Sequence, residues 1–283
     1  MTWIYLGIAS AALLGCYEIF KKSALNANAV IPVLFLATVA GALPWVAILS
    51  FSQFAPGRLD GTLLYLPPTD LHLHGLLFFK AFIVAASWMG AYFGMKHLPI
   101  SIASPIRASA PVWTLIGAML LFAERPSGIQ WIGLLFILAG YFSLSLAGRA
   151  EGIVFHRNPW IWCMIVGTLI GAASALYDKY LLRQFPAAQV QCWFSIYLVV
   201  ILAPVFLGAW LPNRHRTTPI SWRWSIPLIG LTLAAADFLY FQALRDPDAM
   251  ISILSAIRRS NALLSFTWGA MVPVADKAAA RAA

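Results

Sequence analysis

Two arginines stand deep within apolar segments, and each has polar neighbours at helical spacing. Ser104 precedes Arg107 by three residues, and Ser255 and Asn261 lie three residues before and after Arg258. Side chains at this spacing share one face of a helix. A guanidinium donates paired hydrogen bonds to a carboxylate or a phosphate. Because an arginine in hydrocarbon costs from about 3 to more than about 10 kcal/mol, we expect both to face a polar interior and to bind an anionic or zwitterionic group, with a static role at helix ends as the alternative.

A carboxylate joins this set of candidate residues. Asp237 lies near the middle of its apolar segment and shares a helix face with Tyr240. A charge in that position needs a proton or a counter-ion, and Arg258 and Arg259 are the nearest candidates. Asp237 and Tyr240 are therefore predicted to line the same site, where Asp237 serves in proton coupling or amine binding. A purely structural ion pair is the other interpretation.

Aromatic and histidine residues complete the search for chemistry. Trp88 and Tyr92 are one helical turn apart and predict a wall that stacks a planar substrate, with packing as the alternative. His72 and His74 are two residues apart and share no helix face, so we expect no metal site there. The three cysteines show no ligand spacing. We expect neither a metal nor another cofactor, and no hydrolase or metalloprotease motif is present.

The elements that position these residues must be membrane helices. The chain of 283 residues is 61% hydrophobic and only 10% charged, and its mean hydropathy is +0.80. Apolar stretches of about 20 residues are long enough to cross a bilayer as helices. Nine such spans are predicted, at 3–20, 30–51, 74–95, 99–122, 127–147, 159–182, 188–211, 224–244 and 248–270. The fold class is therefore an all-α, polytopic membrane protein, and the net charge of +9 indicates topology signals at helix ends rather than nucleic-acid binding.

The chain matches itself when it is shifted. Pro44 meets Pro204 at a shift of 160 residues, and Arg107 meets Arg258 at a shift of 151. The repeated unit contains five helices, and an odd number of crossings places the second copy upside down relative to the first. Inverted repeats of this kind are typical of secondary transporters, which bind substrate near the bilayer midplane. The predicted units are a first repeat at 3–147, a second repeat at 159–270 with four helices, and an Ala-rich tail at 271–283.

The repeats resemble the EamA-type members of the drug/metabolite transporter superfamily, which have ten helices. The resemblance rests on segment 98–140 with its Arg107, Pro111 and Glu124, and on the counterpart segment 234–269. It implies an inner-membrane carrier that alternates access to a central cavity lined by the first, third and fourth helix of each repeat. The chain departs from this pattern after Gly269, where we expect a tenth helix to be missing.

The same resemblance draws attention to two further carboxylates. Glu18 and Asp178 match at the shift of 160 residues and lie late in the first helix of each repeat. Related small multidrug-resistance carriers exchange protons at a carboxylate in the first helix, which makes both residues candidates for coupling. Lys22 and Lys179 are close in sequence, however, and a solvated ion pair at the helix end is the favoured interpretation.

These observations favour a secondary transporter of small organic metabolites, with amino acids and other carboxylates as candidate substrates. The expected partners are the small-molecule substrate, a coupling proton, membrane lipids and a second copy in a homodimer, but no nucleic acid. The expected location is the bacterial inner membrane. The alternatives are an inactive truncated paralogue or scaffold and, less favoured, an intramembrane lipid-linked transferase.

Overall fold

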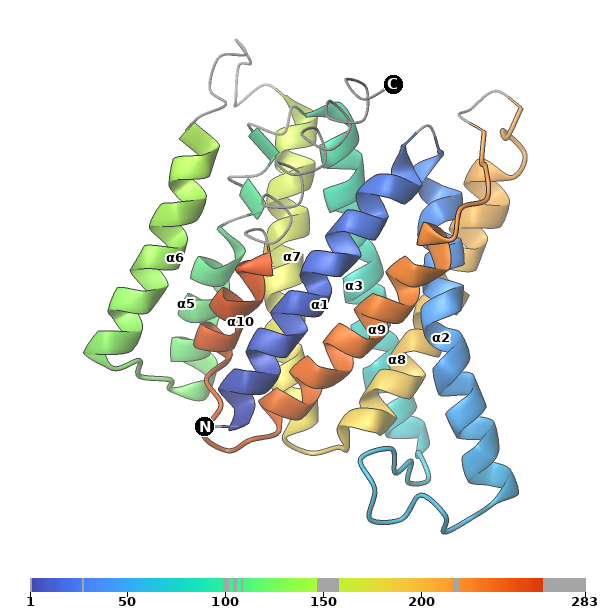
Figure 1. Cartoon of the computed structure of the whole chain (residues 1–283), viewed down its shortest axis with the longest axis horizontal. Coiled ribbons are helices and arrows are strands. Elements are labelled where there is room, and N and C mark those ends of the chain that lie inside the picture. The colour runs from blue at the N-terminus through green and yellow to red at the C-terminus, as the bar shows by residue number, and fades with distance from the viewer. Residues whose placement is uncertain are drawn as a thin grey trace, which may run out of the picture.

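The computed structural model describes residues 2–26, 28–98, 102–103, 106–107, 109–146, 158–215 and 219–261. Within them the chain is helical and contains no strand (Figure 1). The helices are α1 (Thr2–Leu25), α2 (Val30–Phe54), α3 (Leu71–His97), α5 (Ala110–Phe122), α6 (Gly128–Leu146), α7 (Pro159–Leu182), α8 (Ala187–Val205), the π-helix η2 (Phe206–Trp210), α9 (Ser225–Leu244) and α10 (Ile251–Arg259). This confirms the predicted all-α class.

Six of the described helical segments are long and apolar enough to cross a membrane. They are α1, α2, the first part of α3, α7, α8 with η2, and α9. α5 is a shorter apolar helix that fills the second half of the predicted span at 99–122. Only the first part of the predicted span at 248–270 is described, as α10. The expectation that a tenth helix is missing concerns residues 262–283, which lie outside the described part of the chain.

Helix starts follow from local capping chemistry. The Asp70 side chain accepts a hydrogen bond from the backbone N–H of Leu73 at 3.0 Å and caps α3. Before α6, the Gln130 side chain accepts from the backbone N–H of Ser127 at 2.7 Å, and the Ser127 hydroxyl accepts from that of Gln130 at 3.4 Å. This reciprocal pair is a capping box. Asn158 caps α7, whose first residue is a proline. These polar caps fix where the spans begin, because the first N–H groups of a helix otherwise lack partners.

The helices pack in two reciprocal pairs. α1 lies along α9, and α3 lies along α7 (Figure 1). α2 and α8 contact each other, and in addition α2 packs on α9 and α8 packs on α3. Glycines bring the backbones close at these crossings. A Cβ added to Gly41 on α2 would lie 2.8 Å from the carbonyl oxygen of Gly230 on α9, and one on Gly90 of α3 would lie 3.0 Å from that of Cys163 on α7. Small residues at such crossings allow the close packing that holds helices together in lipid.

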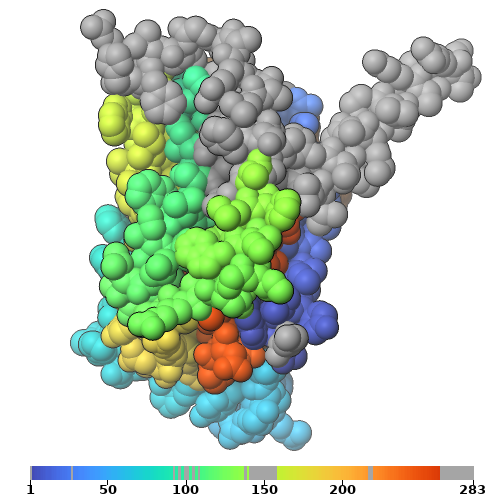
Figure 2. Space-filling view, turned by 90° about the vertical axis from the view of Figure 1, so that its left-hand side faces the viewer, coloured from blue at the N-terminus to red at the C-terminus, as the bar shows by residue number. Residues whose placement is uncertain are grey.

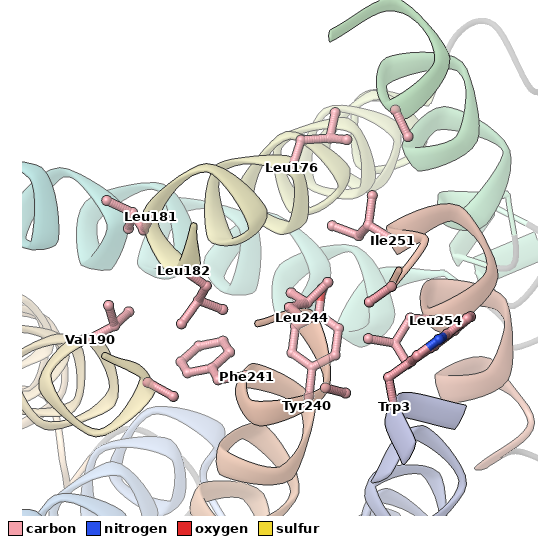
Figure 3. Close-up of a cluster of buried hydrophobic side chains, with 14 of the residues drawn as sticks. Trp3, Leu176, Leu181, Leu182, Val190, Tyr240, Phe241, Leu244, Ile251 and Leu254 are labelled. Atoms are coloured by element: carbon pink, nitrogen blue, oxygen red, sulfur yellow. The ribbon is translucent and has the colours of Figure 1, made fainter. Parts of the chain in front are cut away.

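The largest buried apolar cluster gathers side chains near the beginnings and ends of several helices (Figure 3). It joins Trp3 at the start of α1, Leu77 near the start of α3, Leu182 at the end of α7, Leu244 at the end of α9 and Ile251 at the start of α10. We call this region the packed end. α6 lies at the surface beside it (Figure 2), where Leu134 packs on α5 and α10.

Candidate functional site: a charged central cavity

A cavity of about 270 Å³ lies between the two halves of the bundle. Its walls come from α1, α3, α5, α7, α9 and α10, together with Phe194 of α8. Among the described residues, four cationic and three anionic side chains line it. They are Lys80, Arg107, Arg258 and Arg259, and Glu18, Asp178 and Asp237. A polar chamber of mixed charge inside an apolar bundle suits a small substrate that carries both charges.

Arg258 and Asp237 form an ion pair across α10 and α9. The Nη2 atom of Arg258 donates to Oδ1 of Asp237 at 2.5 Å, and the guanidinium lies over the ring of Tyr240 at 4.1 Å. The Nε atom of Arg258 is buried and has no hydrogen-bond partner among the described residues. A buried donor without a partner costs about 1–3 kcal/mol. Arg258, which lines the cavity, therefore keeps one buried donor atom without a partner in the described part of the chain.

Lys80 and Asp178 form a second buried ion pair, between α3 and α7. The ammonium of Lys80 also lies 4.2 Å from the ring centroid of Phe194 and 5.1 Å from that of Phe241. Lys80 is 1% exposed and was not among the predicted site residues. The sequence did contain a signal for Lys80. It is a single lysine within the apolar span predicted at 74–95, and a charge in that position needs a partner inside the bundle.

The structure contradicts the expected partners of the two first-helix carboxylates. Glu18 pairs with Lys21 at 2.5 Å, one helical turn later, and not with the exposed Lys22. Asp178 is buried and pairs with Lys80, so it is not part of a solvated pair with Lys179. The expectation failed for Asp178 because adjacent residues on a helix point to different faces.

Lys179 instead reaches a buried carboxylate at the packed end. Its ammonium donates to Oε1 of Glu124 at 2.6 Å and to the carbonyl of Ala249 at 2.7 Å. The Glu124 carboxylate also accepts from the backbone N–H groups of Ile251 and Ser252, at 2.8 and 3.2 Å, and from the Ser252 hydroxyl at 2.6 Å. Glu124 thus caps the start of α10, where a negative charge is favoured.

The ionisation of Glu124 follows from these contacts. Burial alone raises the pKa of the carboxyl, but the hydrogen bonds from Lys179 and Ser252 outweigh it and hold the pKa below its ordinary value of 4.5. Glu124 lies in the connection between α5 and α6, outside the apolar helices. The carboxylate is therefore charged at neutral pH and ties α5, α7 and the start of α10 together.

The described side chains that the sequence singled out come together in this cavity. Trp88 lines it from α3, Tyr240 from α9, Ser255 and Arg258 from α10, and Asn261 follows α10. Arg107, Asp237, Glu18 and Asp178 also line it, each from a different stretch of the chain. Ser104 and the side chain of Tyr92 lie outside the described residues. The site adds Lys80 to the predicted set, and it includes Arg259, which the sequence offered as a counter-ion of Asp237.

Known proteins resemble this chain in sequence and in fold. The model of the EamA-like transporter family matches residues 1–146. A probable terminal-alkyne amino-acid exporter of Streptantibioticus cattleyicolor is 22% identical over 199 residues, which are 68% of this chain and 65% of that protein. The matched region thus spans slightly less than two thirds of the exporter. A crystal structure titled only "Crystal structure of protein" superposes with a TM-score of 0.69 at 15% identity, over 96% of this chain and 88% of the other, which shows a shared fold.

Proposed function

Because the chain belongs to the EamA-like transporter family, we propose that it is a secondary transporter of small zwitterionic metabolites, with amino acids as the principal class. The protein is an integral multi-pass membrane protein whose family moves molecules across membranes. We place it in the bacterial plasma membrane, as its exporter relative comes from a bacterium. It acts by alternating access rather than by chemical conversion of its substrate.

The buried Nε atom of Arg258 is the observation that carries this proposal. It is an unused donor on a guanidinium that pairs with Asp237 and belongs to a residue of the cavity wall. A substrate carboxylate accepts from Arg258, and a substrate ammonium lies against Asp237. Arg258 and Asp237 thus pair with each other before the substrate binds. The bound substrate separates them and gives each charge a new partner. The amino-acid class agrees with the description of the exporter relative.

The packing of the helices supports two inverted repeats, 3–147 and 159–270. A repeat that maps α1 on α7 and α3 on α9 requires that the α1–α9 contact have an α7–α3 counterpart, and the bundle has both contacts. Alternating access then consists of opening the packed end while the opposite end closes. The Lys80–Asp178 pair crosses between the repeats, and we assign it as the candidate site for a coupling proton.

Binding measurements on purified protein test the proposal. We expect a set of L-amino acids to raise the thermal stability, because a ligand at 100 times its Kd stabilises a protein by about 2.7 kcal/mol. Arg258→Gln should weaken this binding about tenfold or more, since hydrogen bonds to charged groups contribute about 1.5–3 kcal/mol. The matched control is Arg245→Gln, an exposed arginine at the end of α9, which should leave binding unchanged.

Transport measurements in proteoliposomes distinguish a carrier from a transferase and from a scaffold. A carrier exchanges labelled amino acid across the membrane and returns it unchanged, whereas a transferase consumes it. Equal binding by the wild type and Arg258→Gln would remove Arg258 from the substrate site. If no amino acid binds or exchanges at all, the ion pairs hold a scaffold and the proposed function is wrong.

A further inference from the structure

A second, smaller cavity adjoins the charged one. Its volume is about 40 Å³, and it lies between α1, α2, α8 and α9. Trp88, Phe194 and Asp237 line both cavities, so the two chambers share a wall. We call the smaller one the side pocket. Most of its lining is apolar, with side chains such as Val33 and Leu198.

Among the described polar side chains that line the side pocket, one buried atom has no hydrogen-bond partner. Lys21 is paired with Glu18 at 2.5 Å, and the Thr38 hydroxyl donates to the carbonyl of Leu34 at 2.8 Å. Gln191 is 1% exposed, and its Nε2 atom makes only a long contact of 3.4 Å to the Ser195 hydroxyl. Its Oε1 atom has no hydrogen-bond partner among the described residues. A buried acceptor of this kind costs about 1–3 kcal/mol until a donor reaches it.

The size of the side pocket limits what can enter. A water-sized group occupies about 10–15 Å³ of such volume, so 40 Å³ accommodates about three to four heavy atoms. Asp237 lies on the wall that the two cavities share, and its position determines how the bound substrate is oriented. An ammonium bound there and a carboxylate bound at Arg258 leave the third substituent of the substrate carbon next to the side pocket.

We propose that the side pocket is the specificity subsite for the substrate's side chain, and that it selects side chains of about three to four heavy atoms that carry one hydrogen-bond donor. This inference rests on the proposed function, because it needs a zwitterion in the central cavity. The apolar walls take the carbon atoms, and Oε1 of Gln191 accepts the donor. A methyl group in the same place leaves that oxygen without a partner, and a ring is too large.

L-Threonine and L-valine are matched probes for this subsite. Their side chains have the same shape and three heavy atoms each, but only threonine carries a hydroxyl donor. We expect threonine to bind the wild type about tenfold more tightly than valine, which corresponds to about 1.4 kcal/mol at the Gln191 acceptor. Gln191→Met keeps the volume and removes the acceptor, so it should abolish the preference. Glycine has no side chain, and its binding should be the same in both proteins.

A second variant tests the pocket without removing a polar group. Ala234 lines the side pocket from α9, whereas its neighbour Ala235 is exposed on the outside of the same helix. Ala234→Leu fills the pocket, so it should weaken both threonine and valine at least tenfold and leave glycine binding intact. The matched control, Ala235→Leu, should bind all three as the wild type does.

The outcomes separate this inference from the proposed function. Equal binding of threonine and valine to the wild type, or a preference that survives in Gln191→Met, overturns the role of Gln191. Unchanged threonine binding in Ala234→Leu overturns the subsite as a whole, even if Gln191→Met does not fold. In each of these cases glycine still binds and the transporter assignment stands. Failure of all three amino acids to bind the wild type overturns the proposed function itself.

Discussion

Glu18 and Asp178 match at a shift of 160 residues, yet the structure holds the two carboxylates in different ways. Glu18 pairs with Lys21 one turn later, so this bond stays within α1. Asp178 pairs with Lys80 and ties α7 to α3. The next residue along α7, Lys179, ties the same helix to Glu124 and to the connection before α10.

The same contrast separates the two ends of the cavity. α1 begins and α7 ends at the packed end, so Asp178 lies toward that end and Glu18 lies toward the other (Figure 1). At the packed end, the Lys80–Asp178 pair joins two helices, the Lys179–Glu124 pair joins α7 to the connection between α5 and α6, and both add to the largest apolar cluster. A bond within one helix does not restrain helix movement, whereas a bond between helices must break before they separate. These two pairs are therefore contacts that an opening of the packed end must break.

The largest effect is expected at Glu124. Glu124→Ala leaves Lys179 buried without its carboxylate and removes the acceptor for two backbone N–H groups at the start of α10. Removing one partner of a buried pair costs about 3–5 kcal/mol. Thermal unfolding of the purified protein should show a clearly lower Tm. The adjacent and exposed Arg125 supplies the control, and Arg125→Ala should stay within about 0.5 kcal/mol of the wild type. If the two variants unfold alike, the contacts of Glu124 do not hold the packed end.

A smaller difference should distinguish the two matched carboxylates. Asp178→Asn leaves the ammonium of Lys80 buried without a charged partner and should destabilise by about 3 kcal/mol. Glu18→Gln also leaves a buried ammonium, that of Lys21, without its carboxylate. Glu18 itself is only partly buried and the pair lies within one helix, so the loss of stability should be smaller than in Asp178→Asn.

A double variant checks the cause of this difference. Lys80→Met combined with Asp178→Leu removes both charges together and should recover most of the stability lost in Asp178→Asn, because apolar replacement of a buried pair is often neutral. Chemical unfolding of the three variants measures the comparison. Equal losses of stability in Asp178→Asn and Glu18→Gln would mean that the two carboxylates contribute alike, whichever end of the cavity they lie toward.

The sequence predicted the helices better than it predicted their ion pairs. Apolar length alone placed the long spans, and the spacing around Arg258 led to the cavity. The partner of Asp178 was assigned wrongly because its true partner, Lys80, lies 98 residues away. Glu124 was used only to recognise the resemblance, since its bonds to α10 span 127 and 128 residues. Contacts between distant helices depend on packing and register, which one sequence does not encode locally.

The side pocket could not be predicted for the same reason. Gln191 lies in an apolar helix with no charged neighbour, and its significance appears only when Oε1 is seen to be buried without a partner. The other amide of α8, Gln189, is two residues away, so the two share no helix face and give no spacing signal. In contrast, Asp237 and Arg258 carry charge in apolar segments, which is costly enough to be conspicuous in any sequence.

The smallest expected effect is a pH dependence at the packed end. The folded protein holds the pKa of Glu124 below 4.5, so the carboxylate contributes stability that is fully present above that pH. This contribution is lost as the pH falls through the folded-state pKa, because protonation then becomes favourable in both states. Glu124→Gln keeps the size of the side chain and an acceptor oxygen but does not titrate. The difference in Tm between the wild type and Glu124→Gln should therefore be constant between pH 7 and pH 5 and should shrink below pH 4.5. Taking the difference cancels the titration of the other carboxylates, which both proteins share. A difference that stays constant or grows in acid would show that the charge of Glu124 does not hold the packed end, and that only its hydrogen bonds distinguish this end of the cavity from the other.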